Sequence, residues 1–258
     1  MQDNSPALWQ TLLPDKSNDA HHYDPHKYNY GHAVIYSAPV LIGATRLAAT
    51  AASRIGAGLV NVLTNQDNAG VFRTSLPAHI MVRDDLNWDD PRITAKLYGS
   101  GGLSAPPVFD ANIPIVLDAD ALIGLPSKLS PHYILTPHEG EFERAFPDLH
   151  GGRVDRAMQA AAKINAHVVL KGPATVIAAP DGRCAVNRHA SADLATAGTG
   201  DVLAGIIAGL AAQHMPLFEA CCAAVWIHGD GGLRVGAGLV ASDLPDVIPA
   251  VLKGLKER

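Results

Sequence analysis

Short β-rich runs alternate with helical periodicity along most of this chain, and this alternation limits the possible folds more than any other feature. Residues 33–35, 59–63 and 133–135 are rich in aliphatic and β-branched side chains. In 43–55, between the first two runs, apolar residues recur at spacings of three and one, which places them on one helix face. Repeated strand–helix–strand order predicts an α/β fold with a mostly parallel central sheet and helices on both faces. We expect further strands at 79–82, 113–117 and 167–170, and further helices at 154–164, 201–213, 217–233 and 243–255.

Pro180-Asp181-Gly182 separates two more strand-like runs, 174–179 and 183–187. Pro and Gly both suit a tight reversal, so we expect a hairpin near a sheet edge. No internal repeat, low-complexity tract or long linker divides the chain. We therefore expect one domain over 1–258, with the polar residues 1–26 as an N-terminal arm.

Composition excludes several classes of partner. Charged residues are 17% of the chain, below the usual ~25%, and hydrophobic residues are 48%, so a large buried core is expected. The net charge is −5 and no block of Lys and Arg appears, which argues against binding to nucleic acid or a membrane surface. The longest apolar runs are too short to span a bilayer, and the first residues do not resemble a secretory signal. The three cysteines fit neither a disulfide framework nor a zinc site, so a reducing cytoplasm is expected.

A Gly/Thr loop runs directly into an apolar helix at Gly198-Thr199-Gly200-Asp201. Glycines allow a ligand to approach the backbone closely. Free N–H groups and the helix dipole then favour an anion, and Asp201 beside a bound phosphate could act as a general base. In the simpler alternative, Asp201 only caps the helix and the glycines only turn the chain.

Three other predicted strands end in polar residues, where a parallel sheet forms its ligand crevice. His138 and Glu141 are three residues apart, so one helical turn would set them on one face, beside a metal-bound water or a phosphate. Lys171 could bind a phosphate, and Asp118 with Asp120 could contact Mg²⁺ through water. The structural alternatives are an ordinary helix start, a solvated lysine in a turn, and carboxylates that bond only within a turn.

Together these segments resemble the ADP- or ATP-dependent NAD(P)H-hydrate dehydratases of the ribokinase-like superfamily. The resemblance covers most of the chain, from about His26 to the last helix. Its specific motifs are 117–122 (LDADAL), 135–141 (LTPHEGE), 171–175 (KGPAT) and 194–205, which contains Gly-Thr-Gly-Asp. It implies a mostly parallel sheet between helices. It also implies that a nucleotide phosphorylates the hydroxyl of the hydrated nicotinamide ring, and that departure of phosphate restores NADH or NADPH.

The resemblance also implies site residues. Asp201 would deprotonate the ring hydroxyl, and N–H groups of 197–200 would stabilise charge on the transferring phosphoryl group. Mg²⁺ would neutralise the phosphates of ADP or ATP, with Glu141 organising its waters. The nucleotide-binding residues would be Lys171, Gly172, Pro173, Ala174, Thr175, Gly198, Thr199 and Gly200. The substrate-binding residues would be Ala44, Gly101, His138 and Asp201.

Two segments depart from the family pattern, both on the substrate side. Tyr36-Ser37-Ala38-Pro39 stands where a Gly-Gly pair is usual, and Gly99-Ser100-Gly101-Gly102-Leu103 replaces Gly-Pro-Gly-Leu-Gly. The lost Gly-Gly pair leaves a non-catalytic nucleotide-binding relative open. A kinase for a small alcohol stays open as well, because the Gly-Thr-Gly-Asp helix would serve the superfamily's kinases equally well. The choice of ADP or ATP, and of NADH or NADPH hydrate, stays open as well. Family assembly implies a homo-oligomer, for example a tetramer, and the chain length implies a separate epimerase as pathway partner.

Overall fold

The computed structural model describes residues 1–14, 26–109 and 112–257, and these contain one ten-stranded sheet. The strand order across it is β1-β10-β9-β8-β7-β6-β5-β2-β3-β4. The strands are β1 (Gln2–Asp3), β2 (His32–Tyr36), β3 (Leu59–Leu63), β4 (Met81–Arg83), β5 (Ala95–Tyr98), β6 (Ile115–Leu117), β7 (Tyr133–Leu135), β8 (His167–Leu170), β9 (Thr175–Ala178) and β10 (Cys184–Asn187). The α-helices are α1 (Ile42–Arg54), α2 (Gln66–Ser75), α3 (Glu139–Ala145), α4 (Arg153–Ile164), α5 (Thr199–Ala212), α6 (Leu217–Val235) and α7 (Asp243–Lys256).

The predicted mostly parallel sheet is confirmed. Every pairing is parallel except those of β9, which runs antiparallel to both β8 and β10. The hairpin around Pro180–Gly182 therefore exists, and it lies one strand in from the edge because β1 pairs outside β10. Strand β4 begins two residues later than the sequence pattern predicted.

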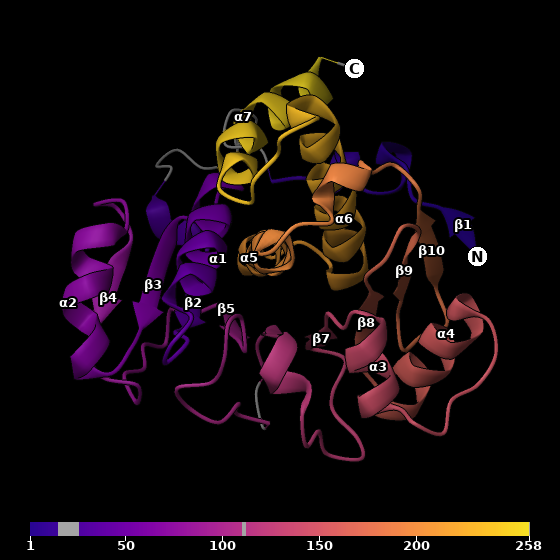
Figure 1. Cartoon of the computed structure of the whole chain (residues 1–258), viewed down its shortest axis with the longest axis horizontal. Helices are drawn as coiled ribbons and strands as arrows, with labels where there is room; N and C mark the ends of the chain where they lie inside the picture. Colours follow the sequence, from indigo (N-terminus) through magenta and orange to yellow (C-terminus); the bar gives the residue numbers. More distant parts are fainter. Residues whose placement is uncertain (15–25, 110–111, 258) are drawn as a thin grey trace.

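Helices cover both faces of the sheet, as predicted (Figure 1). Helices α1, α5, α6 and α7 bury one apolar cluster, and α4 with the short α3 buries the other. Helix α5 crosses α1 closely at Gly205, which has no side chain. A Cβ there would lie 2.2 Å from the carbonyl oxygen of Ala48. This contact fixes α5, and hence the loop before it, against the sheet.

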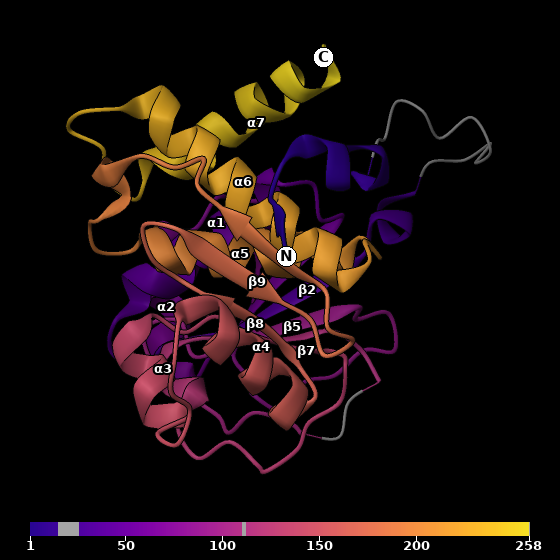
Figure 2. The same ribbon diagram turned by 90° about the vertical axis from the view of Figure 1, so that its right-hand side faces the viewer.

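Residues 1–14 of the expected N-terminal arm pack against the rest of the fold. Strand β1 adds to the sheet, and the N-terminal segment passes beside α6 (Figure 2). Trp9 is fully buried, and its ring lies 5.7 Å from that of Trp226 in α6. Trp9 Nε1 donates to Asn4 Oδ1 (3.1 Å), and Asn4 Nδ2 donates to the carbonyl oxygen of Cys222 (2.7 Å). The free energy gained by burying the large indole holds this segment in place, although the residues around Trp9 are mostly polar. Residues 15–25 of the expected arm lie outside the described residues.

Helix α2 and strand β5 were not predicted. Strand β5 has four residues, one of them Lys96, and α2 carries a polar sequence whose buried contacts come mainly from Ala69 and Phe72. Neither segment shows a clear apolar period. Among the described residues, no helix combines the length and apolarity that crossing a membrane requires.

Candidate active site

Polar residues from four elements meet at the carboxyl edge of the parallel strands. Asp118 directly follows β6, Thr136 follows β7 and Lys171 follows β8. The first turn of α5, with Gly200 and Asp201, comes to the same place, since a Cβ on Gly200 would lie 3.4 Å from Lys171 Nζ. The sheet thus assembles residues far apart in sequence at the position expected for a ligand crevice.

A buried ion pair lies at the centre of this site. Lys171 Nζ lies 2.9 Å from Asp118 Oδ1 and 3.9 Å from Glu141 Oε2. Asp118 also accepts hydrogen bonds from Thr136 Oγ1 (2.8 Å) and Ser100 Oγ (3.2 Å). Burial alone would lower the pKa of Lys171, but the neighbouring carboxylates raise it above its usual value. Lys171 is therefore a fixed cation at neutral pH.

The second carboxylate of the predicted Asp118–Asp120 pair lies elsewhere. The side chain of Asp120 is exposed in the turn after β6, beside Gly102 and Pro39. Asp118 is thus buried in the ion pair, whereas Asp120 faces solvent. Among the described residues, no group of three or more His, Cys, Asp or Glu side chains forms a metal site.

The loop before α5 leaves the first turn of that helix open. Gly198 has a φ of 91°, and a Cβ there would lie 2.7 Å from Leu47 Cδ1. Within the described residues, no side chain caps this helix end. Uncapped N–H groups beside a buried ammonium make a strong anion site.

Asp201 lies in that first turn with an altered acidity. Burial raises its pKa to about 6, the negative charge of Asp118 adds to the shift, and Lys171 opposes it. A carboxylate with this pKa is mostly ionised at pH 7 yet is a stronger base than an ordinary aspartate. Its electrostatic environment suits proton abstraction beside the anion site.

Thr199 and His228 stabilise the loop before α5 through hydrogen bonds to its backbone. Thr199 Oγ1 donates to the carbonyl oxygens of Leu194 (2.8 Å) and Thr196 (3.1 Å). The Thr199 carbonyl oxygen lies 2.9 Å from His228 Nε2, so that ring nitrogen carries the proton. Burial lowers the pKa of His228 to about 4, and its ring is neutral at pH 7. The Thr199 hydroxyl therefore fixes the backbone of the anion site.

His138 and Glu141 form the start of α3. His138 Nδ1 accepts from the N–H of Glu141 (3.4 Å), and Glu141 Oε2 accepts from the N–H of His138 (2.8 Å), a reciprocal capping box. The two side chains face each other, with His138 Nε2 3.3 Å from Glu141 Oε1. The expected shared face is confirmed, and the structural alternative of a helix start holds as well. His138 stays half exposed and Glu141 points toward Lys171.

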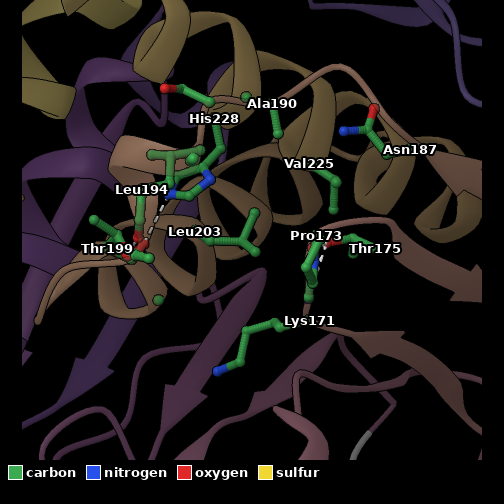
Figure 3. Close-up of a pocket in the computed structure, with 16 residues that line it drawn as sticks. Lys171, Pro173, Thr175, Asn187, Ala190, Leu194, Thr199, Leu203, Val225 and His228 are labelled. Carbon is green, nitrogen blue, oxygen red and sulfur yellow. Dashed lines mark hydrogen bonds between the residues drawn. The ribbon is translucent and has the colours of Figure 1, made fainter. Parts of the chain in front are cut away.

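A pocket of about 550 Å³ opens beside Lys171 and the first turn of α5 (Figure 3). Figure 3 shows Lys171 and Pro173 along one side and Ala190 and His228 along the other. Its volume suits a nucleoside and its phosphates. The predicted residues Lys171, Gly172, Pro173, Thr175, Thr199 and Gly200 line it, together with Asn187, Ala190, Ser191, Ala192, Leu194, Ala195, Leu203, Val225, His228 and Gly229.

Sequence reasoning missed the wall that α6 and the end of β10 contribute. Val225 and His228 lie in an apolar helical run, and Asn187 ends a strand, so each has an ordinary structural explanation. Val225 and His228 are three residues apart, which puts both on one helix face, and this spacing was the available signal.

The predicted substrate residues Ala44 and Gly101 touch one another. A Cβ on Gly101 would lie 2.6 Å from that of Ala44 and 3.2 Å from that of Ala38. Tyr36 does not enter this space, because its buried ring stacks on Tyr98 in the core, with centroids 4.0 Å apart. The departure at Tyr36 is thus accommodated inside the fold.

Comparison with known proteins is consistent across sequence and structure. A family model described as NAD(P)H-hydrate dehydratase matches residues 34–250. An ADP-dependent (S)-NAD(P)H-hydrate dehydratase from Neisseria meningitidis is 34% identical over 260 residues, which cover 91% of this chain and 88% of that protein. The chain spans about half the length of the bifunctional NAD(P)H-hydrate repair enzymes that it also matches.

Solved structures agree with the sequence matches. The ADP/ATP-dependent NAD(P)H-hydrate dehydratase of Bacillus subtilis, co-crystallised with ATP and Mg²⁺, superposes with a TM-score of 0.84 at 30% identity, covering 98% of both chains. A ribokinase-like superfamily protein of Enterococcus faecalis gives a TM-score of 0.86 at 23% identity, covering 99% of this chain and 96% of its own, a likeness of fold alone. The predicted ribokinase-like fold is therefore confirmed.

Proposed function

Because this chain belongs to the NAD(P)H-hydrate dehydratase family, we propose that it restores hydrated NADH or NADPH at the expense of a nucleotide. The substrate is the S epimer, in which water has added across a double bond of the reduced nicotinamide ring. A nucleotide phosphorylates the ring hydroxyl, and the product then loses phosphate. The observation that carries this proposal is Asp201, a buried carboxylate of raised pKa in the uncapped first turn of α5 beside Lys171.

Asp201 acts first in the proposed reaction. Its carboxylate takes the proton of the ring hydroxyl as the oxygen attacks the terminal phosphorus of the nucleotide, and the bond from that phosphorus to the bridging oxygen breaks. The C–O bond to the new phosphate then breaks and the adjacent ring carbon loses a proton, which restores the double bond. The protein's main tasks are to align the hydroxyl with the donor and to exclude water.

Lys171 and the backbone of α5 bind the transferring group. The N–H groups of 197–200 and the Lys171 ammonium lie where negative charge develops, and the pocket beside them accepts the nucleoside. We assign Lys171, Gly172, Pro173, Ala174, Thr175, Gly198, Thr199 and Gly200 to nucleotide binding, with Thr199 acting through the loop carbonyls that it holds.

The site also fits Mg²⁺ carried by the nucleotide. A magnesium ion is commonly held by one or two carboxylates together with the phosphates, so a built cage of protein ligands is not needed. Glu141 faces Lys171 and would hold waters of such an ion. When bound, Mg²⁺ supplies positive charge that neutralises the phosphates.

Ala44, Gly101 and His138 form the proposed substrate side. Ala44 and Gly101 pack against each other as a pair of small residues, and the half-exposed His138 offers an imidazole edge near Glu141. We propose further that the enzyme works in the cytoplasm as a homo-oligomer such as a tetramer, with an epimerase supplying the S epimer. The three free buried cysteines suit a reducing compartment.

An absorbance assay tests the function. Hydrated NADH is mixed with the protein and Mg²⁺, with ADP, ATP or no nucleotide in parallel. Return of the reduced nicotinamide band only with nucleotide supports the dehydratase and identifies its donor. A stable phosphorylated product would favour a kinase, and nucleotide binding without turnover would favour a non-catalytic relative.

A further inference from the structure

Arg153 occupies a position that helix stability does not explain. It is the first residue of α4, where the helix dipole disfavours a positive charge. Its side chain is about two-thirds buried, although arginine usually keeps its charged end in water. The contacts of the guanidinium must therefore compensate for this placement.

Those contacts join two loops of the active site. Arg153 Nη2 donates to the carbonyl oxygens of Leu170 (3.1 Å) and Lys171 (3.0 Å), at the end of β8. Arg153 Nη1 donates to Glu139 Oε2, and Glu139 immediately follows His138 at the start of α3. One planar group thus links the loop of 171–175 to the loop of 136–141.

The position of the Arg153 guanidinium explains why residue 172 is a glycine, because a side chain there would collide with it. A Cβ on Gly172 would lie 2.5 Å from Arg153 Nη2 and 2.9 Å from Arg153 Cζ. The guanidinium therefore lies directly against this Cα. The N–H of Lys171 is held as well, by the carbonyl oxygen of Pro137 (2.8 Å). The peptide that carries Lys171 is therefore held by bonds on both its N–H and its C=O.

We propose that Arg153 is a positioning residue, which holds the nucleotide loop of 171–175 in register with the His138–Glu141 segment. This inference rests on the proposed nucleotide binding. It predicts that loss of the guanidinium loosens the loop of 171–175 and weakens nucleotide binding first. Ala44 in α1 and Gly101 after β5 keep their places, and His138 keeps its capping box with Glu141 while Arg156 still holds Glu139. The signature is a raised Kd and KM for nucleotide with little change in KM for hydrated NADH.

Arg156 supplies a matched control. It lies one turn further along α4 and donates to the same residue, at Glu139 Oε1, but it makes no hydrogen bond to Leu170 or Lys171 in the described structure. Arg156→Met removes an arginine and an ion pair from the same helix without releasing the loop. A purely structural role would give both variants similar effects.

The experiment compares Arg153→Met, Arg153→Lys and Arg156→Met with the wild type. Calorimetry with ADP and Mg²⁺ gives Kd, the absorbance assay gives both KM values, and hydrogen exchange of the unliganded protein gives the protection of 171–175. Arg153→Met should raise Kd for ADP about tenfold, the change that loss of one charge-assisted hydrogen bond produces, and should speed exchange in the loop. Arg153→Lys should recover part of the affinity, and Arg156→Met should stay within about twofold of wild type.

Two results would overturn the proposal. One is a folded Arg153→Met that binds ADP within about twofold of wild type and keeps loop protection. The other is an equal loss in Arg153→Met and Arg156→Met. If Arg153→Met does not fold, Arg153→Lys against Arg156→Lys decides in the same way. Because hydrogen exchange needs neither ligand nor turnover, failure of the dehydratase assay alone would count against the proposed function and not against this inference.

Discussion

The raised pKa of Asp201 predicts that the rate of the proposed reaction falls on the acid side of its pH profile. With a pKa of about 6, Asp201 is ionised to about one-tenth at pH 5 and about nine-tenths at pH 7. If its carboxylate is the base, kcat/KM should fall about tenfold over that interval. At the ordinary pKa of 3.8, the same interval would change kcat/KM by less than about 10%.

The same shift affects stability, with a sign opposite to that of a typical surface carboxylate. A folded-state pKa above the unfolded value means that Asp201 contributes stability below its ordinary pKa and loses it as the pH rises through about 6. Asp201→Asn removes the buried charge. It should raise the free energy of unfolding by at most about 3 kcal/mol at pH 7, and by about 0.5 kcal/mol at pH 4. The variant should therefore gain stability while its turnover falls about 10²- to 10⁴-fold.

Two assays check this prediction. Initial rates of NADH recovery between pH 5 and 8 give the pH profile, and urea unfolding at pH 4 and 7 gives the stability difference. A flat kcat/KM between pH 5 and 7 would contradict the reasoning. So would Asp201→Asn that turns over within a few-fold of wild type, or whose gain in unfolding free energy over wild type is no larger at pH 7 than at pH 4.

Three further predictions follow from single contacts. Lys171→Met should raise Kd for ADP at least about tenfold, because a charge-assisted bond to phosphate is lost, while Lys171→Arg keeps the charge; calorimetry giving unchanged affinity for the Met variant would remove Lys171 from the nucleotide site. Trp9→Ala should lower the free energy of unfolding by about 3–5 kcal/mol in a urea titration while kcat per folded molecule stays constant, and an unshifted midpoint would mean that residues 1–14 are a loose arm after all. Gly205→Ala should cost about 1–3 kcal/mol or more, because its methyl group would lie 2.2 Å from the carbonyl oxygen of Ala48. Gly70→Ala in α2, with no atom within 4 Å of its Cβ, is its control and should not destabilise.

Local patterns in the sequence predicted the strands and helices that carry a clear apolar run or a clear apolar face. Strand β3 was predicted residue for residue, and α4 and α6 within two residues, because their apolar positions repeat with one period. Strand β1 has two exposed residues and is held by pairing with a strand more than 180 residues away. No local period encodes such a partner, so the sequence alone could not reveal this strand.

The site shows the same division between local motif and long-range contact. The Gly-Thr-Gly-Asp turn and the position of Lys171 after a strand are local, and both were predicted. The pairing of Lys171 with Asp118 spans 53 residues, and Arg153 reaches both loops from a helix between them. These contacts depend on how strands β6, β7 and β8 are ordered in the sheet, which the spacing of motifs does not determine. The burial of Asp118 and the exposure of Asp120 likewise depend on the turn between them.

The edge strand β1 also sets an order of events during synthesis. Its partner β10 is translated about 180 residues later, so at ~5–20 residues per second the segment that carries Trp9 waits on the order of 10–40 s for its binding surface. Closing so long a loop is entropically costly, and pairing of β1 is expected to be among the last steps. Until then the indole is exposed to chaperones and proteases, and the nascent sheet ends at a bare strand edge.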